Sequence, residues 1–102
     1  MIVRTWRGRA APAQPDDYPE HFRFRVLPAL KEIRGFLGAS LLRHDRPDEI
    51  EFLVLTRWTS LDAIRAFAGD DYEIPVLEPT ARALLSRCDQ RAQHFTTSSF
   101  TA

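Results

Sequence analysis

An uninterrupted apolar run, Phe52-Leu53-Val54-Leu55, lies within the segment from Glu49 to Trp58, whose residue types predict a β-strand. Successive side chains of a strand point to opposite faces of the sheet, so a run without polar alternation indicates that both faces are buried. The two or three helices that the rest of the chain can form cover only one face of a small sheet. We therefore expect a second copy of the chain to cover the other face, because closed two-fold pairs are the commonest oligomers.

The predicted strand that precedes this one also carries apolar side chains on both faces. Simple alternation places Leu37, Ala39 and Leu41 on one face and Phe36 and Leu42 on the other. Left uncovered, the second face would expose a larger apolar patch than monomers usually carry. The alternative is that the C-terminal tail or a loop folds over the sheet, but this tail is short and polar. A homodimer that pairs through its sheet faces is thus the expected solution.

Periodicity and capping residues assign the rest of the chain. Ser60 and Pro79 mark helix starts, and Pro28 should kink the first helix or break its last turn because it lacks an N–H. Residues 72–77 fit neither pattern. The expected elements are strands over 2–8, 36–44, 49–58 and 87–97, and helices over 16–33, 61–68 and 78–85. This order, β-α-β-β-α-(α)-β, is that of a ferredoxin-like α+β domain with an antiparallel four-stranded sheet.

Composition sets the class of protein. A chain of 102 residues is one domain, here residues 1–102 with a tail at 98–102. Basic and acidic residues number 14 each, so no long-range attraction to nucleic acid or to an anionic membrane is built in. Cys88 is the only cysteine, which excludes a disulfide framework and a cysteine metal cluster. No signal pattern and no long apolar run is present, so we expect a cytoplasmic protein without a membrane partner.

Three stretches of the chain are similar to a known family, and together with their surroundings they span most of the sequence. They are residues 33–39 (IRGFLGA), 51–67 (EFLVLTRWTSLDAIRAF) and 89–95 (DQRAQHF). These stretches resemble the antibiotic biosynthesis monooxygenase superfamily of dimeric α+β barrels. The resemblance implies a small-molecule pocket between the sheet and the helices of each subunit, with Trp58 as a pocket residue.

Two patterns of that superfamily are missing from this chain. Polyketide-oxidising members pair the tryptophan with an asparagine earlier on the same strand, where this sequence has Val54 and Thr56. Haem-degrading members need an asparagine on the first strand and a histidine on the second helix. This chain has no asparagine, and its predicted helix over 61–68 has no histidine. Haem degradation by that constellation is therefore not expected.

Four residues are candidates for a catalytic site, and each has a structural alternative. Trp58 could bond a substrate oxygen through its indole N–H, or fill space between strand and helix. Tyr72, beside the expected pocket mouth, could exchange a proton with a substrate, or be a solvated loop residue. His94 could be a base if its strand face lines the pocket, and otherwise bonds across a dimer interface. Arg82 could hold an enolate or phenolate oxygen, or be solvated.

The expected function is that of a cofactor-independent monooxygenase acting on a small aromatic or quinol substrate in a pocket between sheet and helices. The substrate's own deprotonated form would give an electron to dioxygen, so no cofactor is expected. The histidines His21, His44 and His94 are not spaced as metal ligands, so no metal site is expected either. The alternative is a non-catalytic dimer that binds a small apolar metabolite. A third reading, a haem-handling protein, requires ligation by His94 or His44.

Overall fold

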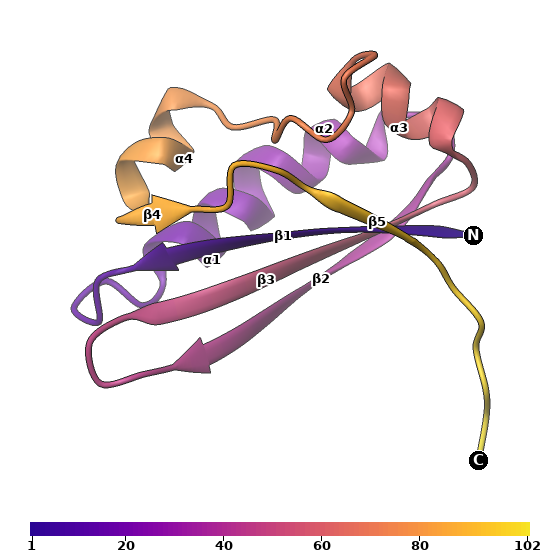
Figure 1. Ribbon diagram of the computed structural model, residues 1–102. Coiled ribbons are helices and arrows are strands. Elements are labelled where there is room, and N and C mark those ends of the chain that lie inside the picture. Colours follow the sequence, from indigo (N-terminus) through magenta and orange to yellow (C-terminus); the bar gives the residue numbers. More distant parts are fainter.

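The computed structural model describes residues 1–102, which form one antiparallel sheet with the helices layered against one of its faces (Figure 1). The strands are β1 (Ile2–Ala10), β2 (Phe36–Asp45), β3 (Ile50–Trp58), β4 (Arg87–Cys88) and β5 (Gln93–Thr96). The helices are α1 (Asp17–His21), the π-helical turn η1 (Phe22–Val26), α2 (Leu27–Lys31), α3 (Leu61–Ala68) and α4 (Pro79–Leu84). The sheet order is β2-β3-β1-β4, and β5 also pairs with β1. The predicted ferredoxin-like α+β order is confirmed.

The last strand differs from its prediction, because residues 87–97 form two short strands instead of one. Asp89 still donates its N–H to the Arg7 carbonyl at 2.9 Å, and its own carbonyl accepts the indole N–H of Trp6 at 2.8 Å. Ala92, however, donates its N–H to Glu73 at 2.7 Å, which takes this residue out of the ladder with β1. A bond to the loop after α3 thus interrupts the strand, and no local sequence pattern encodes it.

The first helix is continuous from Asp17 to Lys31 but changes its hydrogen-bonding pattern in the middle. The N–H of Leu27 reaches back five residues to the carbonyl of Phe22, as in a π-helix. Pro28 then occupies the first turn of α2, where a missing N–H removes little. The expected disruption at Pro28 therefore takes the form of a widened turn just before the proline.

A β-bulge in β2 corrects the predicted faces of this strand. Phe36 pairs with Trp58 and Gly38 pairs with Arg57, so Leu37 is an extra residue without a partner. The extra residue shifts the alternation, and Phe36 lies on the same, helix-covered face as Ala39. The prediction that Phe36 faces away from Ala39 is wrong, because it assumed an unbroken alternation.

The core lies between the sheet and the helices. Every second residue of β3 is buried against the helices, and the residues between them are half-exposed on the other face. The fully buried side chains Phe52, Trp58, Leu30 and Ile64 join β3 to the first helix and to α3. Ser60 caps α3 by accepting the N–H of Ala63 at 3.2 Å, as predicted.

The opposite face of the sheet is not covered by any part of this chain. It carries Leu42, Leu53, Leu55 and Phe95, of which Leu42 and Phe95 are about half exposed. The C-terminal tail runs away from the body of the protein (Figure 1), and its Phe100 is 90% exposed. Folding of the tail over the sheet, the alternative to dimerisation, is not what the structure shows.

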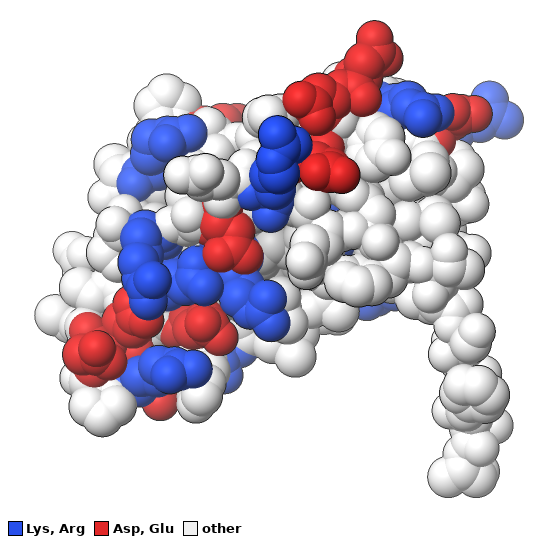
Figure 2. Space-filling view, in the orientation of Figure 1, with Lys and Arg blue, Asp and Glu red and all other residues white.

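Charged side chains at one end of the sheet form interleaved ion pairs (Figure 2). Arg9 lies 2.7 Å from Asp89 and 3.7 Å from Glu51, and Arg87 lies 2.7 Å from Glu49. Acidic and basic groups alternate there, so this face presents no broad field of one sign. No helix of the structure is long and apolar enough to cross a membrane.

Candidate functional site

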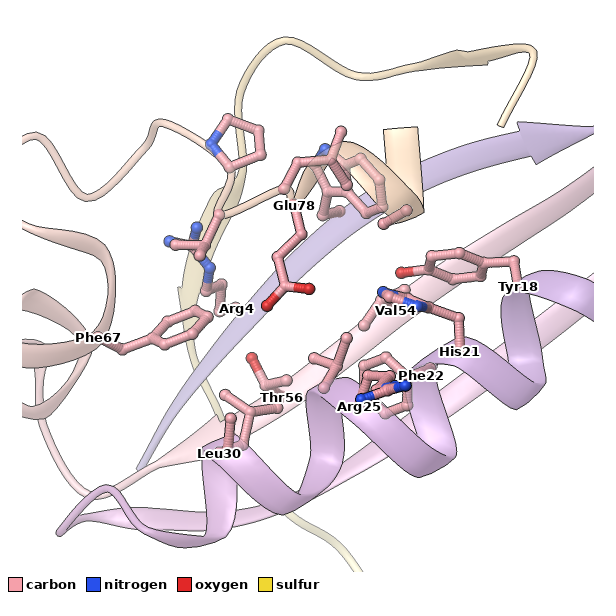
Figure 3. Close-up of a pocket in the computed structure, with 17 residues that line it drawn as sticks. Arg4, Tyr18, His21, Phe22, Arg25, Leu30, Val54, Thr56, Phe67 and Glu78 are labelled. Atoms are coloured by element: carbon pink, nitrogen blue, oxygen red, sulfur yellow. The ribbon is translucent and has the colours of Figure 1, made fainter. Parts of the chain in front are cut away.

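A cavity of about 180 Å³ lies between the sheet and the helices (Figure 3). Its floor is formed by β1 and β3, one wall by the first helix, and its roof by residues 75–78 and α4. Eleven of its 17 lining residues are hydrophobic. An apolar cavity of ~150 Å³ accommodates benzene in other proteins, so this one has room for about one aromatic ring.

Arg4 places a buried positive charge in the wall of this cavity. It lies on the helix-covered face of β1 and is 6% exposed. Its guanidinium donates to the carbonyls of Tyr72 and Ile74, the latter at 3.2 Å, and to Nε2 of His94 at 2.9 Å. These partners are neutral, and Arg4 forms no ion pair with a carboxylate. Burial lowers the pKa of Arg4 to about 10, so the group keeps its charge at neutral pH.

Thr56 lies beside Arg4 because the two residues are paired across β1 and β3 and point to the same face. Its Oγ1 accepts the indole N–H of Trp58 at 2.8 Å. Since the oxygen already accepts this bond, the hydroxyl proton of Thr56 is free to be donated into the cavity. Arg4 and Thr56 together offer hydrogen-bond donors at one end of the cavity.

Trp58 is held in one position behind Thr56. Its side chain is fully buried, with ring centroids 5.3 Å from Phe36 and 5.6 Å from Phe67. The indole does not line the cavity, and its N–H is already bonded to Thr56. Trp58 thus fills the space between strand and helix and sets the orientation of the threonine that reaches the cavity.

The other end of the cavity carries Tyr18 and His21 of α1 (Figure 3). Tyr18 packs 5.4 Å from Phe52, which lies four residues, or about 13 Å, along β3 from Thr56. Burial, and then the charge of Cys88, raise the pKa of Tyr18, so its phenol keeps its proton and donates. His21 is 7% exposed, and its buried Nε2 has no hydrogen-bond partner. This end therefore combines a donor with an unsatisfied ring nitrogen.

His94 and Tyr72 both bond Arg4 but do not line the cavity. His94 is paired with Arg4 across β1 and β5, and the Tyr72 ring meets its imidazole edge-on at 4.9 Å. Burial, reinforced by the charge of Arg4 and opposed by Glu73, lowers the pKa of His94. A neutral His94 accepts the Arg4 N–H, so it orients the guanidinium and does not itself line the cavity.

The structure brings three of the four predicted site residues together and leaves one apart. Trp58, Tyr72 and His94 all lie near the Arg4 end of the cavity without lining it. Trp58 bonds Thr56, and His94 and the carbonyl of Tyr72 bond Arg4. Arg82 is exposed on α4 and does not line the cavity. Arg4, which was not a predicted site residue, is the buried cation that lines the cavity.

None of the 17 lining residues was predicted as a site residue, and four of them carry polar groups at the two ends of the cavity, namely Arg4, Thr56, Tyr18 and His21. The first two had a readable signal, because Arg4 shares a strand face with Trp6 and Thr56 shares one with the apolar residues of β3. A polar residue on a face that is otherwise apolar points to a built site. No pattern in the sequence marks the other two, since their meeting depends on how α1 crosses the sheet.

The mouth of the cavity is lined by charged side chains of both signs. Arg25 of η1 and Glu78, which precedes α4, are both exposed and line the cavity, and the Glu78 carboxylate points into it from above (Figure 3). Arg4 also holds the roof in place, because the carbonyls that it bonds belong to the loop that leads into residues 75–78. The same cation therefore faces the cavity and anchors its cover.

Several solved structures share this fold over nearly the whole chain. A putative antibiotic biosynthesis monooxygenase from Bacillus cereus has a TM-score of 0.68 at 18% identity, covering 99% of this chain and 96% of its own. The haem degrader MhuD from Mycobacterium tuberculosis, solved with two hemes in its active site, has a TM-score of 0.64 at 22% identity, covering 100% of both chains. SnoaB, a cofactor-independent oxygenase from Streptomyces nogalater, has a TM-score of 0.63 at 24% identity, covering 97% and 95%.

The fold and the cavity define an α+β protein whose single antiparallel sheet and helices enclose a cavity between them. The sequence model of the family described as antibiotic biosynthesis monooxygenase matches residues 1–72. The chain belongs to the antibiotic biosynthesis monooxygenase family, and this membership supports a monooxygenase-like function. No curated protein matches the sequence significantly. The match includes Arg4, Thr56 and Trp58, whereas Arg82 and His94 lie beyond it.

Haem, which one structural relative binds, does not suit the residues of this site. The cavity of about 180 Å³ has room for roughly one aromatic ring, far less than a porphyrin needs. The two histidines considered as haem ligands do not line it: His94 bonds Arg4, and His44 is exposed on β2. The site therefore offers no fit for haem, and its own side chains are the groups that could act on a bound molecule.

Proposed function

We propose that the protein is a cofactor-independent monooxygenase that oxidises a small aromatic or quinol substrate in the cavity between sheet and helices. The observation that carries the proposal is Arg4, a buried cation without a carboxylate partner in the wall of an apolar cavity. A buried charge is costly unless something compensates it, and a substrate anion would do so. Family membership supports the same reaction class.

In this mechanism the substrate binds as its anion, with the ionised oxygen on the donors of Arg4 and Thr56. The cation lowers the pKa of the bound phenol and so favours the electron-rich form. The anion transfers one electron to dioxygen, and the two resulting radicals join to form a carbon–oxygen bond. Loss of water then leaves an oxidised ring. For a quinol the balance is quinol plus dioxygen giving hydroxyquinone plus water, and the substrate supplies all four electrons.

The protein contributes position and environment in this scheme. Thr56 and Arg4 fix the reacting oxygen, and Trp58 acts through Thr56 as a positioning residue. His94 and the backbone carbonyl of Tyr72 act through Arg4 in the same way, each by accepting one of its five N–H groups. The apolar walls keep water from the anion and from the radical pair.

Oxygen uptake by the purified protein with a panel of hydroquinones and naphthols tests the proposal. Arg4→Gln should lower kcat/KM about 100-fold, the usual cost of removing one donor to a developing anion. The matched control is Arg34→Gln, which replaces an exposed arginine away from the cavity and should leave the rate unchanged. A folded Arg4→Gln variant with the full rate would remove Arg4 from the mechanism.

A non-catalytic binding module is the second candidate, and one observation favours it. His94, which the sequence offered as a base only if its strand face lines the pocket, is bonded to Arg4 and does not line the cavity. The two candidates differ in turnover. Saturable binding of a quinol without any consumption of oxygen or quinol would favour the binding module.

We also propose that the chain is a homodimer paired through the uncovered sheet face. Leu53 and Leu55 of β3 lie at the centre of that face, and Leu42 and Phe95 extend the apolar surface on either side. Leu53→Glu would place a charge in the middle of the buried interface, so we expect the variant to be a monomer by light scattering. An unmodified protein that is monomeric at micromolar concentration would contradict the dimer.

A further inference from the structure

The two ends of the cavity have different hydrogen-bonding character. Arg4 can only donate into the cavity, because a guanidinium has no acceptor, and Thr56 has a hydroxyl proton to donate because its bond from Trp58 uses only a lone pair of the oxygen. At the other end the phenol of Tyr18 is a hydrogen-bond donor, and the unpaired Nε2 of His21 is available as an acceptor. A group that only accepts fits the first end, and a group that both accepts and donates fits the second.

An ionised oxygen is a group that only accepts, and a neutral hydroxyl both accepts and donates. We propose that the substrate is a single-ring 1,4-diol bound as its monoanion, with the ionised oxygen on Arg4 and Thr56 and the neutral hydroxyl between Tyr18 and His21. This assignment rests on the proposed function and narrows its substrate class. The ring itself occupies the apolar middle of the cavity, between Val54 of β3 and Phe22 of the first helix (Figure 3).

His21 is the residue that we expect to accept a hydrogen bond from the neutral hydroxyl. Its imidazole is more than nine-tenths buried on the cavity wall, and the Nε2 atom has no partner within the protein. Leaving a buried polar atom unpaired is unfavourable, and a ligand hydroxyl at this end would satisfy it. The partners that the fold gives to His21 are aromatic: the Tyr18 ring lies 6.4 Å away, centroid to centroid.

The same contact gives His21 a catalytic role. When the diol is oxidised to a quinone, its second oxygen becomes a carbonyl, so the O–H bond must break. The proton passes to Nε2 of His21, and the electron pair of that bond enters the ring and is delivered to dioxygen. The proton finally leaves with the water that the balanced reaction releases. Tyr18, which keeps its own proton, stabilises the charge that develops on the oxygen.

Binding measured in the absence of oxygen tests the assignment without requiring turnover. Trp6 lines the cavity, so quenching of tryptophan fluorescence reports occupancy. Hydroquinone should bind about 10-fold tighter than phenol, which lacks the second hydroxyl, and than catechol, whose adjacent oxygens reach only one end. Tyr18→Phe and His21→Leu should each abolish this preference and leave the affinity for phenol unchanged. Arg34→Gln, the control, should preserve both.

Equal affinities for hydroquinone, phenol and catechol in the unmodified protein would overturn the assignment, and this comparison needs no variant to fold. A preference for hydroquinone that survives both substitutions would overturn the roles of Tyr18 and His21. Failure of the proposed function gives a different result. In that case hydroquinone shows the predicted preference, but no oxygen is consumed when air is admitted.

Discussion

The hydrogen bond between Trp58 and Thr56 makes a quantitative prediction about two substitutions. Thr56→Val preserves the shape of the side chain but removes the oxygen that accepts the indole N–H at 2.8 Å. Because Trp58 is fully buried, its N–H would then have no partner and no access to water. An unsatisfied buried donor costs ~1–3 kcal/mol, so Thr56→Val should destabilise the fold by about that amount.

Trp58→Phe removes the donor instead and leaves a smaller ring between Phe36 and Phe67. We expect a loss of roughly 2–3 kcal/mol from the contacts that the indole makes, judged from large-to-small core substitutions. In the double variant, however, no polar atom remains unsatisfied at this position. The double variant should therefore lose about 1–2 kcal/mol less than the sum of the two single variants.

Urea unfolding followed by far-UV circular dichroism, at one protomer concentration for all four proteins, measures this coupling. For a domain of this size, 1 kcal/mol corresponds to a shift of about 4–8 °C in Tm, so thermal scans provide an independent check. The same variants should weaken quinol turnover, because both disturb the hydroxyl that faces the substrate. Losses that add within ~0.5 kcal/mol would show that the bond does not hold Thr56 in place.

Two further predictions concern the backbone and the pH dependence. Gly35 has φ +96°, and a Cβ there would lie 2.6 Å from the Cβ of Ala63. Gly35→Ala should therefore lower the free energy of unfolding, measured in urea, by at least ~2 kcal/mol. A neutral effect would contradict the close packing of this turn on α3. The pKa of His94 is lower in the folded protein than its usual 6.5. Between the folded and the unfolded pKa the unfolded chain binds more protons, so the free energy of unfolding falls as pH decreases below 6.5. His94→Gln should remove the contribution of His94 to this fall, as measured by unfolding curves at neutral and acidic pH, and an unchanged difference between the two curves would contradict the prediction.

The order of the elements was readable from the sequence because each element has a strong local signal. Ser60 caps α3, the helix over 61–68 has the predicted bounds, and the alternation in β3 sets one face against the helices. The apolar run from Phe52 to Leu55 predicted that both faces of this strand are buried; one face is buried against the helices, and burial of the other stays a prediction that depends on the proposed dimer. These features depend on residues near one another in the sequence, where propensity and periodicity are informative.

Features set by distant contacts were missed or misplaced. The bulge at Leu37 reversed the predicted face of Phe36, and the bond from Ala92 to Glu73 split the last strand. Both depend on partners that are remote in the sequence, so no window of neighbouring residues reveals them.

The sequence identified residues that neighbour the candidate site but not the residues that line its cavity. Trp58, Tyr72 and His94 do lie around one end of the cavity, but each bonds a residue that lines it and does not line it itself. A cation was expected at Arg82, which does not line the cavity, whereas Arg4 of the first strand does. An arginine on the buried face of a strand is the sequence signal that would have identified it.

In the proposed mechanism Arg4 holds the ionised oxygen of a bound phenol, and the ionisation of a bound chromophore tests this role directly. 4-Nitrophenol absorbs differently as phenol and as phenolate, so titration of the saturated complex gives the pKa of the bound ligand. The account predicts that this pKa is lower than in water by about one unit or more, and that Arg4→Gln abolishes the shift. A bound nitrophenol whose pKa is unchanged or raised in the unmodified protein would contradict the account.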